Sequence, residues 1–156
     1  MAICAATHGS LVRTAALLGV LLLVAGCRTS SPVEVVPVRG VVRLKHQPLA
    51  NAVVTFIPIH ETPGQGGQAV TNSAGEFQVA GHQGEPGLKP GQYRVAVSKL
   101  LRADGTEFPF DSPVSPMDAD ARESIADAYS DPAATQLSAD VQSSMPSLEL
   151  EVTAKK

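Results

Sequence analysis

Short runs of alternating apolar and polar residues recur along the chain from residue 35 onward. Such alternation is typical of β-strands with one face buried and one face in solvent. The clearest run, QYRVAVSK at residues 92–99, places Tyr93, Val95 and Val97 on one face. We therefore predict a half-buried antiparallel strand there with these three side chains in the core. Residues 148–152, LELEV, alternate strictly and predict the final strand.

Five further runs predict strands, at residues 35–44, 52–59, 68–71, 76–79 and 136–141. Gly40 in the first run predicts a kink or a bulge. The first two runs are expected to form a hairpin around residues 45–48, and the third and fourth another around the Asn72–Gly75 turn. About seven short strands predict an all-β fold, a β-sandwich of the transthyretin-like or Ig-like kind.

Residues 101–132, which we name the excursion, interrupt this pattern with an Asp104-Gly105 turn and several prolines. A short helix is expected from Pro116 to Ala128, with Ser115 as its N-cap and proline at its first position. Long irregular segments in compact domains tend to be either functional or mobile. The excursion is therefore the segment that a ligand-binding alternative would use.

The first 26 residues have the three parts of a secretory signal peptide. Arg13 and the partly charged His8 supply the positive flank, residues 15–26 are almost wholly apolar, and small residues precede Cys27. The apolar stretch is about a dozen residues long, whereas a membrane-spanning helix needs roughly 20. We expect residues 1–26 to be removed as a signal peptide rather than kept as an anchor.

The sequence LVAGC at residues 23–27 resembles the bacterial lipobox, whose cysteine receives a diacylglyceryl group and becomes the new N-terminus. The resemblance implies that Cys27 is acylated, with fatty acids such as palmitate, and holds the protein in a membrane. Cys4, the other cysteine, would leave with the signal peptide, so no disulfide is expected. Arg28, in place of Asp, favours the outer membrane with the domain facing the periplasm. Residues 27–34 are expected to be a tether.

Composition limits what the remaining 130 residues can be. That length suits one domain with a real core. Its 11 basic and 15 acidic residues give a net charge of about −4, which does not favour nucleic-acid binding. With no Trp, two Tyr and four Phe in the chain, the core is expected to consist mostly of Val, Leu, Ile and Ala.

Three segments carry a resemblance to the carboxypeptidase regulatory-like family: residues 40–56, 71–77 and 87–95. The resemblance implies a transthyretin-like β-sandwich over residues 35–156. Short bacterial lipoproteins with this domain are similar in layout, including the Ala-Tyr-Ser-Asp-Pro segment that ends at Pro132. Asn72 stands where the family usually has Asp, so a calcium-binding carboxylate is missing there. The resemblance brings no catalytic residues.

The sequence also lacks the usual signatures of catalysis and metal binding. His46, His60 and His82 have no helical spacing and no cysteine partner for zinc. There is no Gly-x-Ser-x-Gly nucleophile motif, and residues 153–156 are TAKK rather than the Tyr-Arg-Gly-Ser of hydroxyisourate hydrolases. The aspartates of the excursion do not follow the EF-hand order. No enzyme activity, metal or cofactor is expected.

These observations predict a membrane-anchored lipoprotein of the cell envelope that acts as a non-catalytic structural or protein-interaction module. Its partners would be the membrane, through Cys27, and a protein or cell-wall component. The alternative is a carbohydrate- or peptide-binding module that uses the excursion. Its candidate ligand-binding residues are Phe108, Phe110 and Tyr129, because Phe56 and Tyr93 are expected inside the core.

Overall fold

The structure, a computed structural model, describes residues 35–156. These residues correspond to the domain that is expected to follow the tether. The signal peptide expected at residues 1–26, the acylated Cys27 and the tether at residues 27–34 lie outside the described residues.

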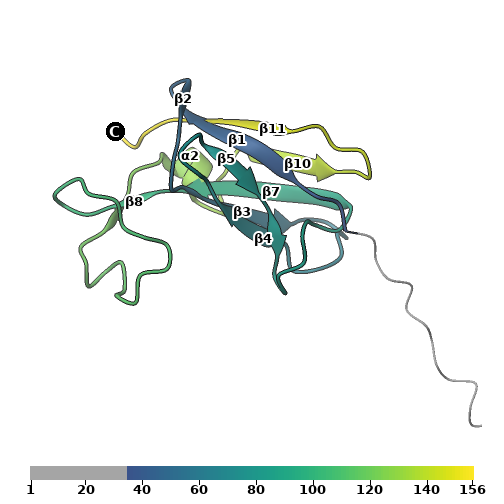
Figure 1. The fold of residues 1–156 in the computed structure, drawn as a ribbon, viewed down its shortest axis with the longest axis horizontal. Helices are drawn as coiled ribbons and strands as arrows, with labels where there is room; N and C mark the ends of the chain where they lie inside the picture. Colours follow the sequence, from purple (N-terminus) through teal and green to yellow (C-terminus); the bar gives the residue numbers. More distant parts are fainter. Residues whose placement is uncertain (1–34) are drawn as a thin grey trace, which may run out of the picture. The chain divides into compact units, whose positions relative to one another are not determined.

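The described residues form an all-β structure of several sheets, as predicted (Figure 1). In the first sheet, β1 pairs with all three other strands, and the members are β1 (Arg39–Leu44), β2 (Gln47–Pro48), β5 (Glu76–Gln78) and β11 (Leu148–Val152). The second sheet has the order β10 (Leu137–Val141), β7 (Gly91–Ser98), β3 (Val53–Pro58), β4 (Gly67–Val70), β6 (Ala80–Gly81). A small third sheet pairs β8 (Leu100–Leu101) with β9 (Arg122–Glu123), and α2 (Asp127–Ser130) is a single helical turn.

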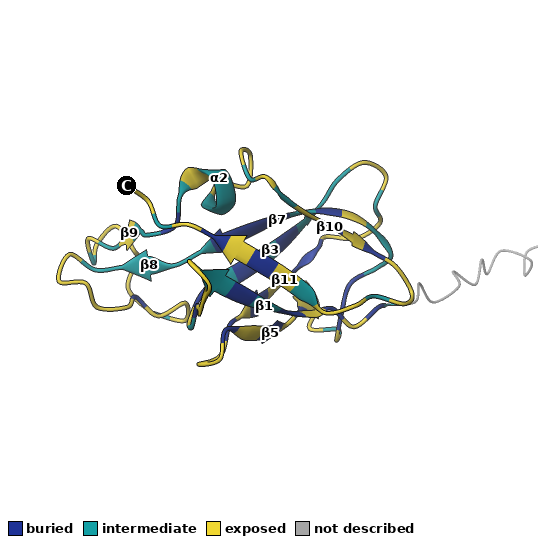
Figure 2. Cartoon of the chain, turned by 90° about the horizontal axis from the view of Figure 1, so that it is seen from above, coloured by how far each residue is buried: buried dark blue, intermediate teal, exposed yellow. Residues whose placement is uncertain are grey.

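The first two sheets contribute to one hydrophobic core (Figure 2). The ring of Phe56 on β3 connects them, because its centroid lies 6.2 Å from that of Phe77 on β5 in the first sheet. Within its own sheet, the same ring lies 6.3 Å from that of Tyr93 on β7. The fully buried side chains are mostly valines, as the composition predicted: Val38, Val42, Val54, Val79, Val95, Val97, Val141 and Val152.

The clearest predicted strand is confirmed as β7, which is antiparallel to both β3 and β10. Tyr93, Val95 and Val97 are buried as expected. Ala96, predicted on the outward face, is buried as well, and α2 contacts this strand. The alternation at the end of the chain is confirmed as β11, which pairs in parallel with β1.

Both hairpin predictions are wrong. β1 pairs with β2 across a turn in which Lys45 and His46 have positive φ, and β3 lies in the second sheet. The Asn72 turn is present, with Asn72 Oδ1 accepting the backbone N–H of Ala74 and Glu76, but β4 and β5 on its two sides lie in different sheets. Alternation indicates which face of a strand is buried, but not which sheet the strand belongs to. Because both sheets bury one face against the same core, their strands have the same alternating pattern.

The predicted kink at Gly40 is also wrong, because the pairing of β1 is continuous through this residue. Gly40 lies opposite Leu148 on β11 and opposite Phe77 on β5. A Cβ atom at this position would lie 2.6 Å from the Phe77 ring. Glycine is present here because a neighbouring ring approaches the backbone closely, not because the strand bends.

The predicted helix from Pro116 to Ala128 is replaced by three shorter elements. Residues 116–120 form a turn in which Ala121 N–H bonds to the Pro116 carbonyl, and Asp120 has a φ of 47°. β9 then pairs with β8, and the only helix of the described late segment is α2. A left-handed residue directly after one turn prevents the helix from continuing, so the helix forms later and is shorter than expected.

A buried hydroxyl joins the turn before β3 to the end of β4. The Thr71 hydroxyl donates to the Leu49 carbonyl at 2.6 Å and accepts the Ala52 N–H at 2.8 Å. Thr71 is the one buried polar residue of the described chain. Sequence reasoning did not identify it, because a threonine at the end of a strand is typical of an exposed position.

Replacement of Thr71 by valine is therefore expected to reduce the free energy of unfolding by about 1–2 kcal/mol, since it leaves a buried N–H without a partner. Thr71→Ser, the control, keeps the hydroxyl and loses one methyl group, at a cost of about 0.8 kcal/mol. Urea unfolding of the three proteins measures both effects. A valine variant as stable as the wild type would show that the hydrogen bonds of the Thr71 hydroxyl do not stabilise the fold.

The described chain begins at one end of the sheets, and the excursion extends from the other end. Val36 bridges Leu88 shortly before β7 starts, whereas the excursion follows the end of β7 at Ser98. β11 runs parallel to β1, so the C-terminus lies at the excursion end, where Ala154 bridges Ile125. Figure 1 shows the start of β1 on the right, and β8 and the C-terminus on the left.

Candidate binding groove

The excursion and the outer face of the second sheet together form a groove of about 370 Å³. Val53 and Thr55 belong to its floor because they point away from the core, in alternation with the buried Val54 and Phe56. The residues from the sheets are Val53, Thr55, Ser98 and Leu100, and Asn51 comes from the turn before β3. Those from the excursion are Phe108, Pro109, Phe110, Ser112, Val114 and Pro116. The groove is mainly apolar, as ligand sites usually are, with a few hydroxyl and amide groups.

Large apolar side chains are exposed around this groove. Phe110 is 61%, Val114 49% and Met117 90% exposed, and all three lie within eight residues of one another in the excursion. Only one other large apolar residue of the described chain is comparably exposed, Val70 on β4 at 45%. A concentration of exposed apolar side chains in one segment is typical of a surface that another molecule covers.

Polar contacts attach the excursion to the loop that precedes β3. The Lys99 ammonium group donates to the Glu107 carboxylate at 2.5 Å and to the Ala50 carbonyl at 2.8 Å. The Asn51 amide donates to the other Glu107 oxygen at 2.5 Å. These bonds fix the position of Glu107, the residue directly before Phe108 in the groove wall.

A second set of contacts fixes the return of the excursion to the sheets. The Glu123 carboxylate accepts hydrogen bonds from the Ser98 hydroxyl at 2.6 Å and from the N–H groups of Lys99 and Ile125 at 3.0 and 2.8 Å. Ser124 donates its N–H and its hydroxyl to the Lys99 carbonyl. Ile125 then enters the core and is completely buried. The long segment is thus tied to the sheets at both of its ends.

Phe108 lies in the wall of the groove and is itself packed. The Arg102 guanidinium lies 5.3 Å from the centre of its ring, a cation–π geometry, and also donates to the Glu107 carbonyl at 2.9 Å. Phe108 is only 9% exposed as a result. This residue supports the groove more than it presents a surface to a ligand.

The structure brings together two of the three predicted ligand-binding residues. Phe108 and Phe110 line the groove, but Tyr129 lies on α2 and packs against the core. Only Phe110 of the three is an exposed aromatic ring, so they do not form a flat aromatic platform for a sugar. Sequence reasoning missed Val114 and Met117, although two apolar residues among prolines and aspartates were a usable signal.

The Lys99 and Asn51 hydrogen bonds lower the pKa of Glu107 below its ordinary value. Ionised Glu107 therefore favours the folded state, and this contribution is lost as the pH falls from the ordinary pKa through the lowered one. Replacement of Lys99 by methionine is expected to raise the pKa of Glu107 towards its ordinary value. Carbon-detected NMR titration of the side-chain carboxyl measures the change.

Asp104 provides the internal control for this titration. Its pKa is also lowered, mainly by hydrogen bonds from Thr106, and Lys99 has no part in that shift. The Lys99→Met variant should leave the titration of Asp104 unchanged. An unchanged Glu107 titration, or equal shifts of both groups, would mean that Lys99 does not hold the groove wall.

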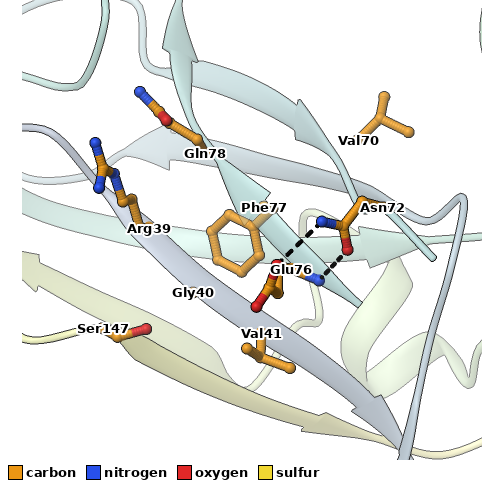
Figure 3. A pocket seen from close by; sticks show the side chains of 9 residues that line it. All are labelled: Arg39, Gly40, Val41, Val70, Asn72, Glu76, Phe77, Gln78 and Ser147. Atoms are coloured by element: carbon orange, nitrogen blue, oxygen red, sulfur yellow. Dashed lines mark hydrogen bonds between the residues drawn. The ribbon is translucent and has the colours of Figure 1, made fainter. Parts of the chain in front are cut away.

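A second hollow, of about 680 Å³, lies at the edge of the first sheet (Figure 3). Two of its polar side chains bond to each other, because the Asn72 amide donates to the Glu76 carboxylate at 3.1 Å and Asn72 Oδ1 accepts the Glu76 N–H. Figure 3 shows the Phe77 ring beside Gly40 in this hollow. The Asn72 turn and the close approach of Phe77 to Gly40 account for part of the lining of this hollow.

The three histidines of the domain, His46, His60 and His82, are all exposed and lie in separate turns. Within residues 35–156, no three His, Cys, Asp or Glu side chains are arranged to hold a metal ion. No helix in this part of the chain is both long and apolar enough to span a membrane.

Comparison of the chain with known protein families, with curated proteins and with solved structures found no match.

Proposed function

We propose that this protein is a lipid-anchored component of the bacterial cell envelope whose β-domain binds a partner protein without catalysing a reaction. Acylated Cys27 would be the anchor, and the groove beneath the excursion would be the binding site. The observation that carries the binding role is the exposed apolar group of Phe110, Val114 and Met117 beside that groove.

The anchoring part of the proposal rests on the sequence. A positive flank, an apolar stretch of about a dozen residues and small residues before Cys27 support export and acylation. Two or more acyl chains hold a protein at a membrane far more firmly than one. Arg28 supports an outer-membrane location in which the domain faces the periplasm.

The finer fold that we propose is a transthyretin-like β-sandwich of the carboxypeptidase regulatory-like kind. Two sheets that share a core support it, and seven of the described strands are at least three residues long. Residues within the resembling segments also have specific structural roles. Gly40 receives the Phe77 ring, Gly75 has a φ of 74° in the Asn72 turn, and the Tyr93 hydroxyl donates to the Lys89 carbonyl at 2.8 Å.

A protein partner fits the groove better than a carbohydrate does. Sugar sites usually present aromatic faces, whereas here Phe110 is accompanied by the aliphatic side chains of Val114 and Met117. An exposed apolar surface with a few polar groups suits the side chains of a protein segment. The hydrogen-bonded ends of the excursion hold this surface in place before binding, which reduces the entropy lost on association.

The position of the groove suits a tethered protein. The described chain begins at the end of the sheets opposite the excursion. The eight residues from Cys27 to residue 34 can span at most about 26–29 Å. An anchor at Cys27 would therefore keep the domain close to the membrane, with the groove on the end away from the attachment point and accessible to a partner in the periplasm.

Photo-cross-linking in cells tests the binding role. A photoreactive phenylalanine analogue at Phe110 is expected to give a discrete protein adduct, and the additional replacement Val114→Ser should weaken that adduct. The same analogue at Val70, a 45% exposed residue on β4 outside the groove, is the matched control and should give no such adduct. The absence of an adduct at Phe110, or equal adducts at both positions, would contradict the proposed site.

A further inference from the structure

The negative charge of the domain is concentrated in the excursion. Residues 101–132 contain eight acidic and two basic residues, a net charge of −6. The rest of residues 35–156 contains six acidic and eight basic residues, a net charge of +2. A domain whose overall charge is only moderately negative therefore has one strongly acidic segment, and that segment also holds most of its exposed large apolar side chains.

Some of these acidic groups are occupied by bonds within the domain. Glu107 is paired with Lys99, Asp120 with Arg122 and Asp127 with Lys155, and Glu123 accepts three hydrogen bonds where the excursion returns to the sheets. These side chains maintain the fold of the excursion, so they are not the groups that we expect a partner to contact.

Two other aspartates are free to contact a partner. Asp111 and Asp118 are exposed, and neither forms an ion pair within the described residues. Asp111 lies in the chain between the groove residues Phe110 and Ser112, and Asp118 follows Met117. Each of these aspartates thus directly follows an exposed apolar residue in the sequence.

We infer that the groove binds a segment of a partner protein in which an apolar side chain is flanked by lysine or arginine. This inference rests on the proposed function and specifies the chemistry of its partner. The apolar side chain contacts Val53, Leu100 and Phe110, and the flanking cations lie next to Asp111 and Asp118. An acidic or uncharged segment would bring no compensating charge to an excursion of net charge −6.

Apolar contact and charge contribute differently to this recognition. A buried aromatic or apolar anchor supplies most of the affinity of a small interface, so Phe110→Ala is expected to weaken binding about tenfold or more. Exposed ion pairs each contribute modestly and are screened by salt, so the double variant Asp111→Asn/Asp118→Asn should weaken binding up to about tenfold and make it less sensitive to salt.

Selection from a random nonapeptide library displayed on phage tests this inference. The full chain, purified in a mild detergent, is used for selection, and the Phe110→Ala variant removes peptides that bind elsewhere. The retained peptides are expected to contain Leu, Ile, Phe or Met flanked by Lys or Arg. Their affinities are then measured for the wild type, for Asp111→Asn/Asp118→Asn and for the control Glu61→Gln/Glu149→Gln, which removes two exposed negative charges outside the excursion.

The outcomes separate this inference from the proposed function. Basic and apolar peptides that lose affinity for the aspartate variant, but not for the control, support it. Retained peptides without basic residues, or equal losses in both variants, would overturn the partner chemistry and leave the groove as a binding site. The absence of any peptide that distinguishes the wild type from Phe110→Ala would overturn the inference, and photo-cross-linking at Phe110 would then decide separately whether the groove binds a protein.

Discussion

Replacement of Phe56 by alanine is expected to lower the free energy of unfolding by about 3–5 kcal/mol, the usual cost of removing a buried phenylalanine ring. Phe56 is 1% exposed, and its ring packs against those of Phe77 and Tyr93. The substitution therefore leaves a cavity between the two sheets and removes the aromatic contact between them. Urea unfolding should show a much lower midpoint with an unchanged slope.

Phe110→Ala is the matched control, because it makes the same chemical change at a residue that is 61% exposed. Substitutions at exposed positions usually change stability by less than about 0.5 kcal/mol. Similar losses in the two variants would contradict this assignment of the core. The control also serves the binding experiments, since a stable Phe110→Ala protein shows that any lost binding does not result from unfolding.

The second large effect is expected at Gly40, where alanine should destabilise the protein by about 2–3 kcal/mol, the upper part of the range for overpacking. Its Cβ atom would lie 2.5 Å from the Leu148 carbonyl oxygen and 2.6 Å from the Phe77 ring. A backbone carbonyl in a paired strand cannot move aside easily. The direction of the stability change is informative, because glycine-to-alanine changes at unstrained positions raise the free energy of unfolding by about 0.4–1 kcal/mol.

Gly81→Ala is the corresponding control. The atoms nearest to a Cβ at Gly81 all belong to the Glu85 side chain, which is flexible and partly in solvent. Its cost should be clearly smaller than that of Gly40→Ala in the same unfolding experiment. A Gly40→Ala variant more stable than the wild type would contradict the close contact of β1 with β11 and with the Phe77 ring.

Strand positions and buried faces were largely predictable from the sequence because period-two alternation is a local signal. Alternation alone placed Tyr93 and Val95 of β7 in the core, and in β11 the buried residues Leu150 and Val152 alternate with exposed glutamates. Strand partners were not predictable, because pairing depends on residues distant in the sequence. β11 bonds to β1 from the other end of the domain, and the Asn72 turn connects two different sheets.

The site was predictable in part. The excursion was named as the segment that a ligand-binding alternative would use, and of its three candidate aromatic residues, Phe108, Phe110 and Tyr129, only Phe110 is exposed. The groove floor was not, because Val53, Thr55 and Leu100 become part of a site only when the excursion folds over the sheet. The contacts of Glu107 and Glu123 could not be predicted from the sequence either, since a charged side chain in a loop usually lies in solvent.

Lipid anchoring is tested most directly by the intact mass and detergent partitioning of the protein from bacterial membranes, compared with those of Cys27→Ala. We expect loss of residues 1–26, added acyl chains on Cys27, and partitioning into detergent that the variant loses. Cys4→Ala, the control, should behave like the wild type. An unmodified chain that stays in the aqueous phase would contradict the proposal that this protein is anchored in the cell envelope.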